Sequence, residues 1–298
     1  MNAFAEVNTV ERIKVVTDSA SEISLKEQKE LGVIVVPMRV QLGKKIYREG
    51  IDITRKKFIG LLNSTSSLPK LLPPTEEDFY RAYLQASRET DFLLSIHMSR
   101  RLVDMSDLIT SAATPFTGRL HVSYIDTRAI SVGQAELVKK AAEMAREGKG
   151  VKEIIRTIHN MVPHVYQYYY TPALNYMERD SLIRPEQAIL GKLLEVKPFL
   201  LVEEGVMVPL EKVLTMEQVL DKLYQFVVEF SHFEKVFIQH SGMGEETEKL
   251  MEMLESYPKM KGKTLDVMDY GISISTYLGP VGLGVTVCEG MEKQQSPY

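Results

Sequence analysis

The sequence predicts an α/β protein with two domains, on three grounds. The chain has 298 residues, and domains commonly run to about 150 residues each. In the first half, short apolar runs alternate with amphipathic segments, a pattern that predicts parallel strands joined by helices. In the second half, a hairpin pattern lies beside strand–helix–strand units, which predicts a mixed sheet. We place the N-terminal domain at residues 12–163 and the C-terminal domain at residues 164–289.

The N-terminal half begins with a buried strand, an apolar run that ends in Asp18-Ser19. The helix that follows stops at Gly32, a residue suited to the left-handed end of a helix. Thr54 and Thr75 are typical helix starts, and residues 63–74 read as a turn-rich loop. Strands are expected at 13–17, 33–36, 91–97 and 120–125, a hairpin at 38–46, and helices at 25–31, 54–62, from 75, 103–113 and 131–146.

The C-terminal half begins with an aromatic strand at residues 165–170. Glu204-Gly205 separates two apolar runs and predicts an antiparallel hairpin of 196–202 with 206–213. Apolar residues in 217–230 repeat with helical spacing. Further helices are expected at 172–179, 185–194 and 245–254, and strands at 235–239 and 264–268, with 283–287 closing the sheet.

Composition excludes several classes of protein. The net charge is −4 and the pI about 6.0, so the basic surface typical of nucleic-acid-binding proteins is missing. No apolar run approaches the ~18 residues of a membrane span. Cys288 is the one cysteine, which excludes an internal disulfide. The first residues lack the basic start and apolar core of a secretory signal, and we expect a cytoplasmic protein.

Polar residues stand at the ends of the predicted parallel strands, where α/β proteins bind ligands. Asp18, Ser19 and His97 are therefore candidate ligand-binding residues. Asp18 and Asp126 also suit a divalent metal, but an aspartate between a strand and a helix is more often a helix cap. We predict no metal site, and we keep as an alternative a small-molecule enzyme that uses these two aspartates.

Motifs for nucleophilic catalysis and for cofactor binding are missing. His97 and Ser99 lie two positions apart in an extended segment and should face the same side, yet no Gly-x-Ser-x-Gly elbow surrounds them. Gly242-Met243-Gly244 follows a predicted strand, but Thr247 stands where a dinucleotide fingerprint has its third glycine. We therefore predict no catalytic residue, no enzyme activity and no cofactor.

Eight segments resemble, in order, the motifs of one family. They are VVTDSASE (15–22), VPMRV with YREGIDI (36–53), LPK (68–70), SIHMS (95–99), IDTRAISVG (125–133), LEVKPFL (194–200), QHSG (239–242) and GP (279–280). On these segments the chain resembles a divergent member of the DegV family, bacterial lipid-binding proteins that include the fatty-acid-binding subunit of fatty acid kinase.

The resemblance implies a fold and a ligand. The DegV fold has an N-terminal Rossmann-like domain with a small hairpin-and-helix insertion, here at about residues 38–74, and a C-terminal mixed α/β domain. One long-chain fatty acid lies between the domains, and hydroxyl groups and a histidine hold its carboxylate. In the kinase system, a separate subunit phosphorylates that carboxylate.

The sequence departs from the family pattern where the carboxylate should be held. The family's Thr-Ser-Gln-Pro is Leu71-Leu72-Pro73-Pro74 here, and its closing histidine is replaced by Tyr277. Two head-group positions, Ser99 and Thr276, still match the family. We add Arg100 and Tyr277 as substitutes for the donors that are lost.

We therefore expect a protein that binds a long-chain fatty acid or a related lipid in a cleft between its domains. Its role would be to carry the lipid or to present it to a partner. The family suggests a kinase subunit as that partner, although the family's arginine falls on Leu182 here. The alternatives are a binding protein for another apolar small molecule and the strand-end aspartate enzyme named above.

Overall fold

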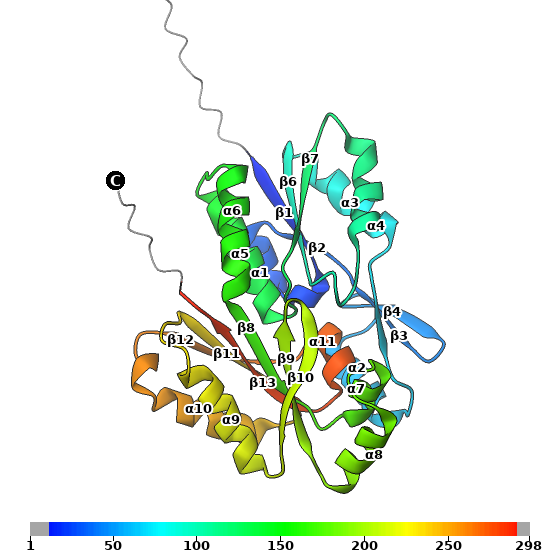
Figure 1. The fold of residues 1–298 in the computed structure, drawn as a ribbon. Helices are drawn as coiled ribbons and strands as arrows, with labels where there is room; N and C mark the ends of the chain where they lie inside the picture. The colour runs from blue at the N-terminus through cyan, green and yellow to red at the C-terminus, as the bar shows by residue number, and fades with distance from the viewer. Residues whose placement is uncertain (1–11, 291–298) are drawn as a thin grey trace, which may run out of the picture.

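The computed structural model describes residues 12–290 and arranges this part of the chain around three sheets. They are a four-stranded parallel sheet, a six-stranded mixed sheet and a small three-stranded antiparallel sheet. Figure 1 shows the parallel sheet in the upper half of the molecule and the mixed sheet in the lower half. The predicted α/β class, with a parallel and a mixed sheet, is confirmed.

The parallel sheet forms from short apolar runs that are covered by helices on both faces. Its strands, in spatial order, are β2 (Ile34–Val36), β1 (Ile13–Asp18), β6 (Phe92–His97) and β7 (His121–Asp126). Its helices are α1 (Leu25–Leu31), α3 (Glu76–Ala86), α4 (Ser106–Ala113), α5 (Val132–Arg146) and α6 (Val151–Met161). Helices α5 and α6 pack on one face and α3 and α4 on the other (Figure 1). The carboxyl ends of β1, β6 and β7 therefore face the mixed sheet together.

Local signals set most of these helix boundaries. Thr75 accepts the backbone N–H of Asp78 while the Asp78 carboxylate accepts that of Thr75, so α3 begins with the predicted capping box. Gly32 ends α1 with a φ of 69°. Helix α6 is missing from the predicted elements, although its buried residues Ile154 and Ile158 have helical spacing.

The small sheet lies in the segment between β2 and α3, where the insertion is expected. Its elements are β3 (Arg39–Leu42), β4 (Lys45–Arg48) and β5 (Lys70–Leu72), accompanied by α2 (Arg55–Ser64). Strand β5 corrects the prediction of a surface loop over residues 63–74, because it pairs with β3 and buries Leu71. Three residues are too few to show an alternating pattern, which explains why the sequence did not reveal this strand.

The mixed sheet has its last strand near the middle. In spatial order its strands are β10 (Val206–Val213), β9 (Lys197–Glu203), β8 (Val165–Tyr170), β13 (Gly282–Cys288), β11 (Lys235–Ser241) and β12 (Thr264–Asp269). We expected 283–287 to close this sheet, but β13 pairs antiparallel with both β8 and β11. The strand order could not be read from the sequence because both neighbours of β13 are distant along the chain.

The hairpin of β9 and β10 is confirmed. Its two-residue turn consists of Glu204 and Gly205, with φ values of 48° and 80°. Two positive φ values are those of a type I′ turn, whose twist matches the twist of the paired strands. We call these two residues the hairpin tip.

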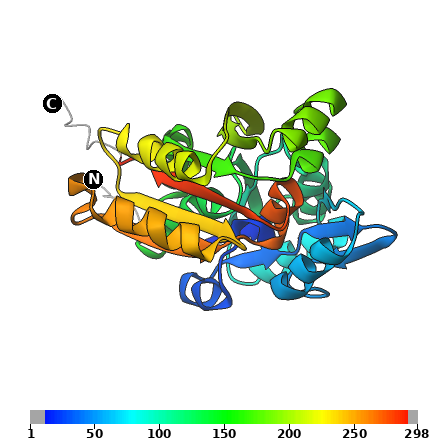
Figure 2. The same ribbon diagram turned by 90° about the horizontal axis from the view of Figure 1, so that it is seen from below.

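Helices cover the mixed sheet unevenly. They are α7 (Leu174–Arg179), α8 (Pro185–Leu193), α9 (Met216–Val228), α10 (Gly244–Glu255) and α11 (Ile272–Leu278). Figure 2 shows α9 and α10 side by side along one face, where they enclose a separate apolar core. Helix α11 is absent from the predicted elements, because Ile272–Leu278 is short and almost wholly buried and so lacks an amphipathic pattern.

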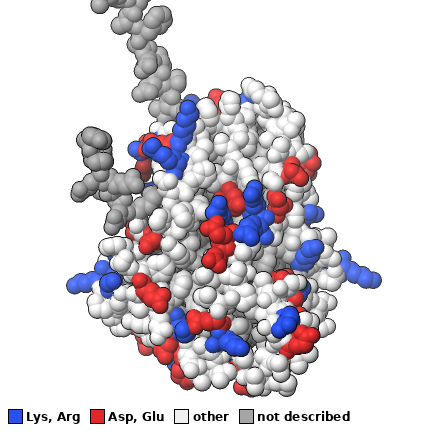
Figure 3. All heavy atoms as spheres, in the orientation of Figure 1, with Lys and Arg blue, Asp and Glu red and all other residues white. Residues whose placement is uncertain are grey.

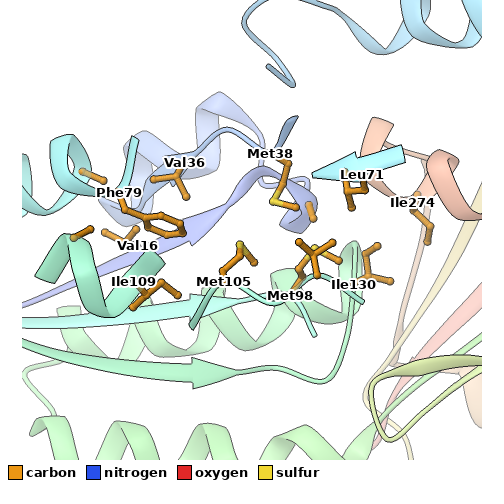
Figure 4. Close-up of a cluster of buried hydrophobic side chains, with 14 of the residues drawn as sticks. Val16, Val36, Met38, Leu71, Phe79, Met98, Met105, Ile109, Ile130 and Ile274 are labelled. Carbon is orange, nitrogen blue, oxygen red and sulfur yellow. The ribbon is translucent and has the colours of Figure 1, made fainter. Parts of the chain in front are cut away.

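A central cluster of buried apolar side chains lies where the three sheets meet. It includes Val16 of β1, Leu71 of β5 and Leu200 of β9, one from each sheet. It is rich in methionine, with Met38, Met98, Met105, Met177 and Met207 all nearly or fully buried. Figure 4 shows Met38, Met98 and Met105 gathered in the middle of this cluster.

Candidate functional site

Asp18, at the end of β1, is a fully buried carboxylate that accepts four hydrogen bonds. One oxygen accepts the N–H of Ala20 at 3.0 Å, so Asp18 caps the 3₁₀ helix η1 (Ser19–Ser21), as a strand-end aspartate should. The other oxygen lies 2.9 Å from His97 Nδ1, 3.0 Å from the Met98 N–H and 3.1 Å from Gln134 Nε2. Asp18 thus joins β1 to β6 and α5.

His97 extends this network into a chain of side-chain hydrogen bonds. Its Nε2 lies 2.7 Å from Ser95 Oγ, and Ser95 Oγ lies 2.8 Å from the hydroxyl of Tyr83. We call Asp18, His97, Ser95 and Tyr83 the polar chain. All four side chains are inaccessible to solvent, and burial raises the pKa of the Tyr83 hydroxyl. The order of groups resembles a Ser–His–Asp triad, but solvent-sized molecules do not reach it in this structure.

The partner of His97 is therefore Ser95 and not Ser99, which corrects the expected pairing. Strand β6 ends at His97, so the two-residue alternation that relates Ser95 to His97 does not continue to Ser99. Ser99 instead starts a turn and donates from Oγ to the carbonyl of Gly205 at 2.6 Å. The same Oγ accepts the backbone N–H of Arg101 at 3.2 Å. Ser99 is buried beneath the hairpin tip.

Asp126 and Arg100 lie on the outer side of this turn. Asp126 accepts the backbone N–H groups of Arg100 at 3.2 Å and Arg128 at 3.0 Å. We had predicted that Asp126 caps α5. This prediction is wrong, because the N-cap position of that helix is Ser131. The Arg100 side chain is 62% exposed and its Nε lies 3.8 Å from Asp126. Arg100 thus faces solvent, and the structure gives no support to the head-group role that we assigned to it.

Thr276 and Tyr277 lie on α11. The Thr276 hydroxyl donates to the carbonyl of Ser273 within the helix, at 2.7 Å. The Tyr277 hydroxyl donates to the carbonyl of Leu102 at 3.3 Å, in the turn that Ser99 begins. Of these two, Tyr277 is therefore the residue that the fold brings to the Ser99 turn.

Arg179 connects three segments that are distant along the chain, and the sequence analysis did not identify it. Its guanidinium donates to the carbonyls of Pro69 and, at 2.8 Å, of Thr276, and it pairs with Asp180. It thereby ties α7 to the small-sheet segment and to α11. The resemblance had placed an arginine at Leu182, three positions later. Because the contacts of Arg179 are to backbone carbonyls far along the chain, no local spacing identifies it.

Ser19 binds a buried acid. Its hydroxyl donates to Glu49 at 2.7 Å, and the other oxygen of Glu49 accepts the N–H groups of Ile272 and Ser273 at 3.1 and 3.2 Å. Burial is the main cause that raises the pKa of the Glu49 carboxyl. Glu49 therefore anchors the start of α11 to η1, and Ser19 has a structural partner.

Glu22 lies beside this anchor and lines a cavity of about 500 Å³. Its carboxylate accepts the N–H of Gly271 at 3.0 Å. Burial raises the pKa of Glu22 to about 8, and hydrogen bonds from Ser131 and Gly271 offset this only in part. Glu49 is close enough to raise it further. Within residues 12–290, no group of three or more acidic, histidine or cysteine side chains could hold a metal ion.

Comparison with known proteins identifies the family of the chain. A family model described as "Uncharacterised protein, DegV family" matches residues 12–290. A DegV domain-containing protein from Deinococcus radiodurans is 30% identical over 193 residues, covering 65% of this chain and 68% of that protein. Protein DegV from Bacillus subtilis is 27% identical over 283 residues, covering 93% of this chain and 99% of its own.

Solved structures agree. A DegV family protein from Thermus thermophilus, whose structure is described as showing fatty acid binding, has a TM-score of 0.82 and 26% identity. DegV from Bacillus subtilis, described as a fatty acid binding protein, has a TM-score of 0.82 and 25% identity. Each comparison covers 94% of this chain and 100% of the other. In the described part of the chain, no helix is both long and apolar enough to cross a membrane. The model match over residues 12–290 and these two structures show that the chain belongs to the DegV family.

Proposed function

We propose that this protein binds a long-chain fatty acid or a related lipid, and carries it or presents it to a partner. The lipid tail would enter the central cluster, and the head group would lie at Ser99. The observation that carries the proposal is the methionine-rich central cluster, which is enclosed by all three sheets and reaches Met98, the neighbour of Ser99. The solved relatives described as fatty acid binding proteins support the same conclusion.

Methionine suits an interior that must open around a ligand. Its side chain is unbranched and flexible, and it fills irregular space without fixing one shape. A sixteen-carbon tail offers roughly fourteen methylene groups, each worth about 0.8 kcal/mol on burial. Such a tail supplies free energy that can offset the displacement of methionine side chains from the central cluster.

The head group needs few polar partners. Ser99 is a buried hydroxyl at the edge of the central cluster, and a hydrogen bond to a charged group contributes about 1.5 to 3 kcal/mol. Leu71 is packed into the cluster, so the segment that carries hydroxyl groups in the family is apolar here. The proposal therefore concerns binding and carriage, and does not extend to phosphorylation by a kinase subunit.

Lipid extraction tests the proposal directly. We expect mass spectrometry of an organic extract of the purified protein to find a long-chain fatty acid. Delipidated protein should regain thermal stability when palmitate or oleate is added, because a ligand that binds only the folded state stabilises it. An extract without lipid, together with no thermal shift from either acid, would contradict the proposal.

A pair of variants locates the tail. Ile109 of α4 is 3% exposed in the central cluster, and Ile154 of α6 is fully buried on the opposite face of the parallel sheet. Ile109→Phe and Ile154→Phe both overpack a core and should lower stability by about 1 to 3 kcal/mol. Only Ile109→Phe should also abolish binding of palmitate in isothermal titration. Equal binding by the two variants would place the tail elsewhere.

A further inference from the structure

The hairpin tip crosses from the mixed sheet to the turns that follow β6 and β7. The carbonyl of Gly205 accepts the Ser99 hydroxyl at 2.6 Å, and the carbonyl of Glu204 accepts Arg101 Nη1 at 3.1 Å. The carboxylate of Glu204 pairs with the guanidinium of Arg128. One hydroxyl and two guanidinium groups thus converge on oxygen atoms of two adjacent residues.

The oxygen atoms of the tip are hydrogen-bond acceptors, as are the oxygen atoms of a fatty-acid carboxylate. A carboxylate accepts hydrogen bonds from hydroxyl and guanidinium donors, and such charge-assisted bonds are the stronger ones in proteins. We propose that Ser99, Arg101 and Arg128 form the binding site for the lipid carboxylate, and that the hairpin tip occupies this site when the lipid is absent. This inference rests on the proposed function and assigns the groups that hold the head.

The contacts of the tip are of a kind that a ligand can replace. The side chains of Arg128 and Glu204 are 55% and 69% exposed, and exposed ion pairs contribute little to stability. Figure 3 shows acidic and basic side chains gathered near the centre of the face where the tip meets the parallel sheet. A carboxylate anchored by a buried tail therefore competes well against Glu204.

Movement of the tip would also open the central cluster. Val202 of β9 and Met207 of β10 belong to or pack against that cluster, directly behind the tip. The hairpin is therefore both a wall of the proposed tail site and the cover of the proposed head site. One displacement would release Ser99, free both arginines and expose the apolar interior.

Gly205 has no side chain, and this allows the hairpin tip to lie in close contact with Ser99. Its φ is 80°, and a Cβ atom at this position would lie 2.3 Å from Ser99 Oγ. Gly205→Ala should therefore push the tip away from Ser99, both by this clash and by the strain of a positive φ. The inference predicts that this variant takes up lipid faster than the unaltered protein, because the tip no longer fits the empty site.

The decisive experiment compares charge variants by isothermal titration of delipidated protein with oleate. Glu204→Gln removes the internal competitor and should tighten binding by about three- to tenfold. Glu203→Gln removes the same charge from an exposed residue next to the tip and should leave affinity unchanged. Arg128→Asn should weaken binding about fivefold or more, since Asn tolerates the φ of 50° at this position.

Arg100→Gln is the matched control for Arg128→Asn. Arg100 is an exposed arginine of the same region, but it faces Asp126 and not the tip. We expect it to bind oleate as the unaltered protein does. Equal affinities for Glu204→Gln, Arg128→Asn and both controls would overturn the inference while leaving lipid binding intact. Failure of the unaltered protein to bind oleate or palmitate would instead overturn the proposed function, and the inference with it.

Gly205→Ala supplies an independent readout. Uptake of a fluorescent fatty acid by delipidated protein should be several times faster in this variant, because the tip no longer blocks the site. Gly118→Ala, another glycine with a φ of 80° but far from the tip and with open space around it, controls for the strain alone. The same uptake rate in both variants would argue against the hairpin tip as the occupant of the empty site.

Discussion

Two polar sites lie within three residues of each other at the end of β6, and they are built in opposite ways. The polar chain of Asp18, His97, Ser95 and Tyr83 is closed to solvent, and each member has a side-chain partner inside the protein. Ser99 is just as buried, but its acceptor is a backbone carbonyl on a hairpin tip. The other contacts of the tip are a hydrogen bond from Arg101 and an exposed ion pair with Arg128.

On our proposal, this difference separates a structural site from a ligand-binding site. A buried polar group needs a hydrogen-bond partner, and removing that partner lowers the stability of the folded state because the group is left unpaired away from water. The polar chain meets this need with groups fixed by β1, β6 and α3, so no ligand atom can improve on it. The partner of Ser99 is a backbone carbonyl of a turn, and on our proposal a carboxylate replaces it without leaving the hydroxyl unpaired.

The largest effect should come from Asp18→Ala. This change leaves the N–H groups of Ala20 and Met98 and the side chain of His97 without their acceptor in a solvent-free site. We expect a loss of about 3 kcal/mol or more in the free energy of unfolding, measured by urea denaturation. A change below about 1 kcal/mol would mean that the polar chain is not structural.

Glu22 tests whether the number of hydrogen-bond donors around a buried carboxyl group decides whether that group is protonated. Its pKa of about 8 lies above the ordinary 4.5 because burial outweighs its few hydrogen bonds. Its contribution to stability is therefore fully present below pH 4.5 and is lost as the pH rises to about 8. The slope is at most about 1.4 kcal/mol per pH unit, and less here because Glu22 is partly exposed to the cavity.

Glu22→Gln should remove this pH dependence. The amide oxygen can still accept the N–H of Gly271, so the variant should be more stable than the unaltered protein at pH 8. The charged groups that face Glu22 include Glu49 and Arg55, which remain in the variant. Glu30→Gln, which alters an exposed carboxylate on α1, is the control. A stability curve from pH 5 to 8 that is the same in all three proteins would contradict the prediction.

Ser99→Ala should affect fatty-acid affinity more than stability, whereas Asp18→Ala should affect stability most. We expect fatty-acid affinity to fall about tenfold or more, because about 1.4 kcal/mol is a factor of ten. The free energy of unfolding should fall by only about 1 kcal/mol, since two hydrogen bonds of the turn are lost. Thr276→Val should weaken binding less, because the Thr276 hydroxyl already donates to Ser273. Isothermal titration on delipidated protein measures both. Unchanged affinity in Ser99→Ala would move the head group elsewhere or indicate an uncharged lipid.

Tyr83→Phe should give the smallest effect. The ring stays packed against Phe79, at a centroid distance of 6.0 Å, and only the hydrogen bond to Ser95 is lost. We expect a loss of about 1 kcal/mol in the free energy of unfolding and no change in affinity for oleate. A marked loss of affinity would show that the polar chain also contacts the ligand.

Elements with a strong local signal were predictable from the sequence. The strand at 13–17 is a short, largely apolar run, and Glu204-Gly205 is a two-residue turn signal between two further apolar runs. The helix starts at Thr54 and Thr75 follow from side chains that accept backbone N–H groups in the first turn. These features depend on residues a few positions apart, which a sequence displays directly.

The site depends on contacts that a sequence does not display. Ser99 meets Gly205 across 106 residues, and Arg179 meets Pro69 across 110. Glu49 anchors α11 although more than 220 residues separate them. The resemblance to a family made Ser99 and Tyr277 candidate head-group residues, but the partners of each residue had to come from the folded chain.

The position of β13 has a consequence for how the protein is made. This strand separates β8 from β11 in the mixed sheet and is the last strand of that sheet to leave the ribosome. Until it emerges, the sheet exists only as two fragments, β10-β9-β8 and β11-β12, each with an unpaired edge. Unpaired edges invite association with other chains, and distant pairings form slowly. Nascent chains that stall before Gly282 should therefore be targets for chaperones, even though the parallel sheet has already been synthesised.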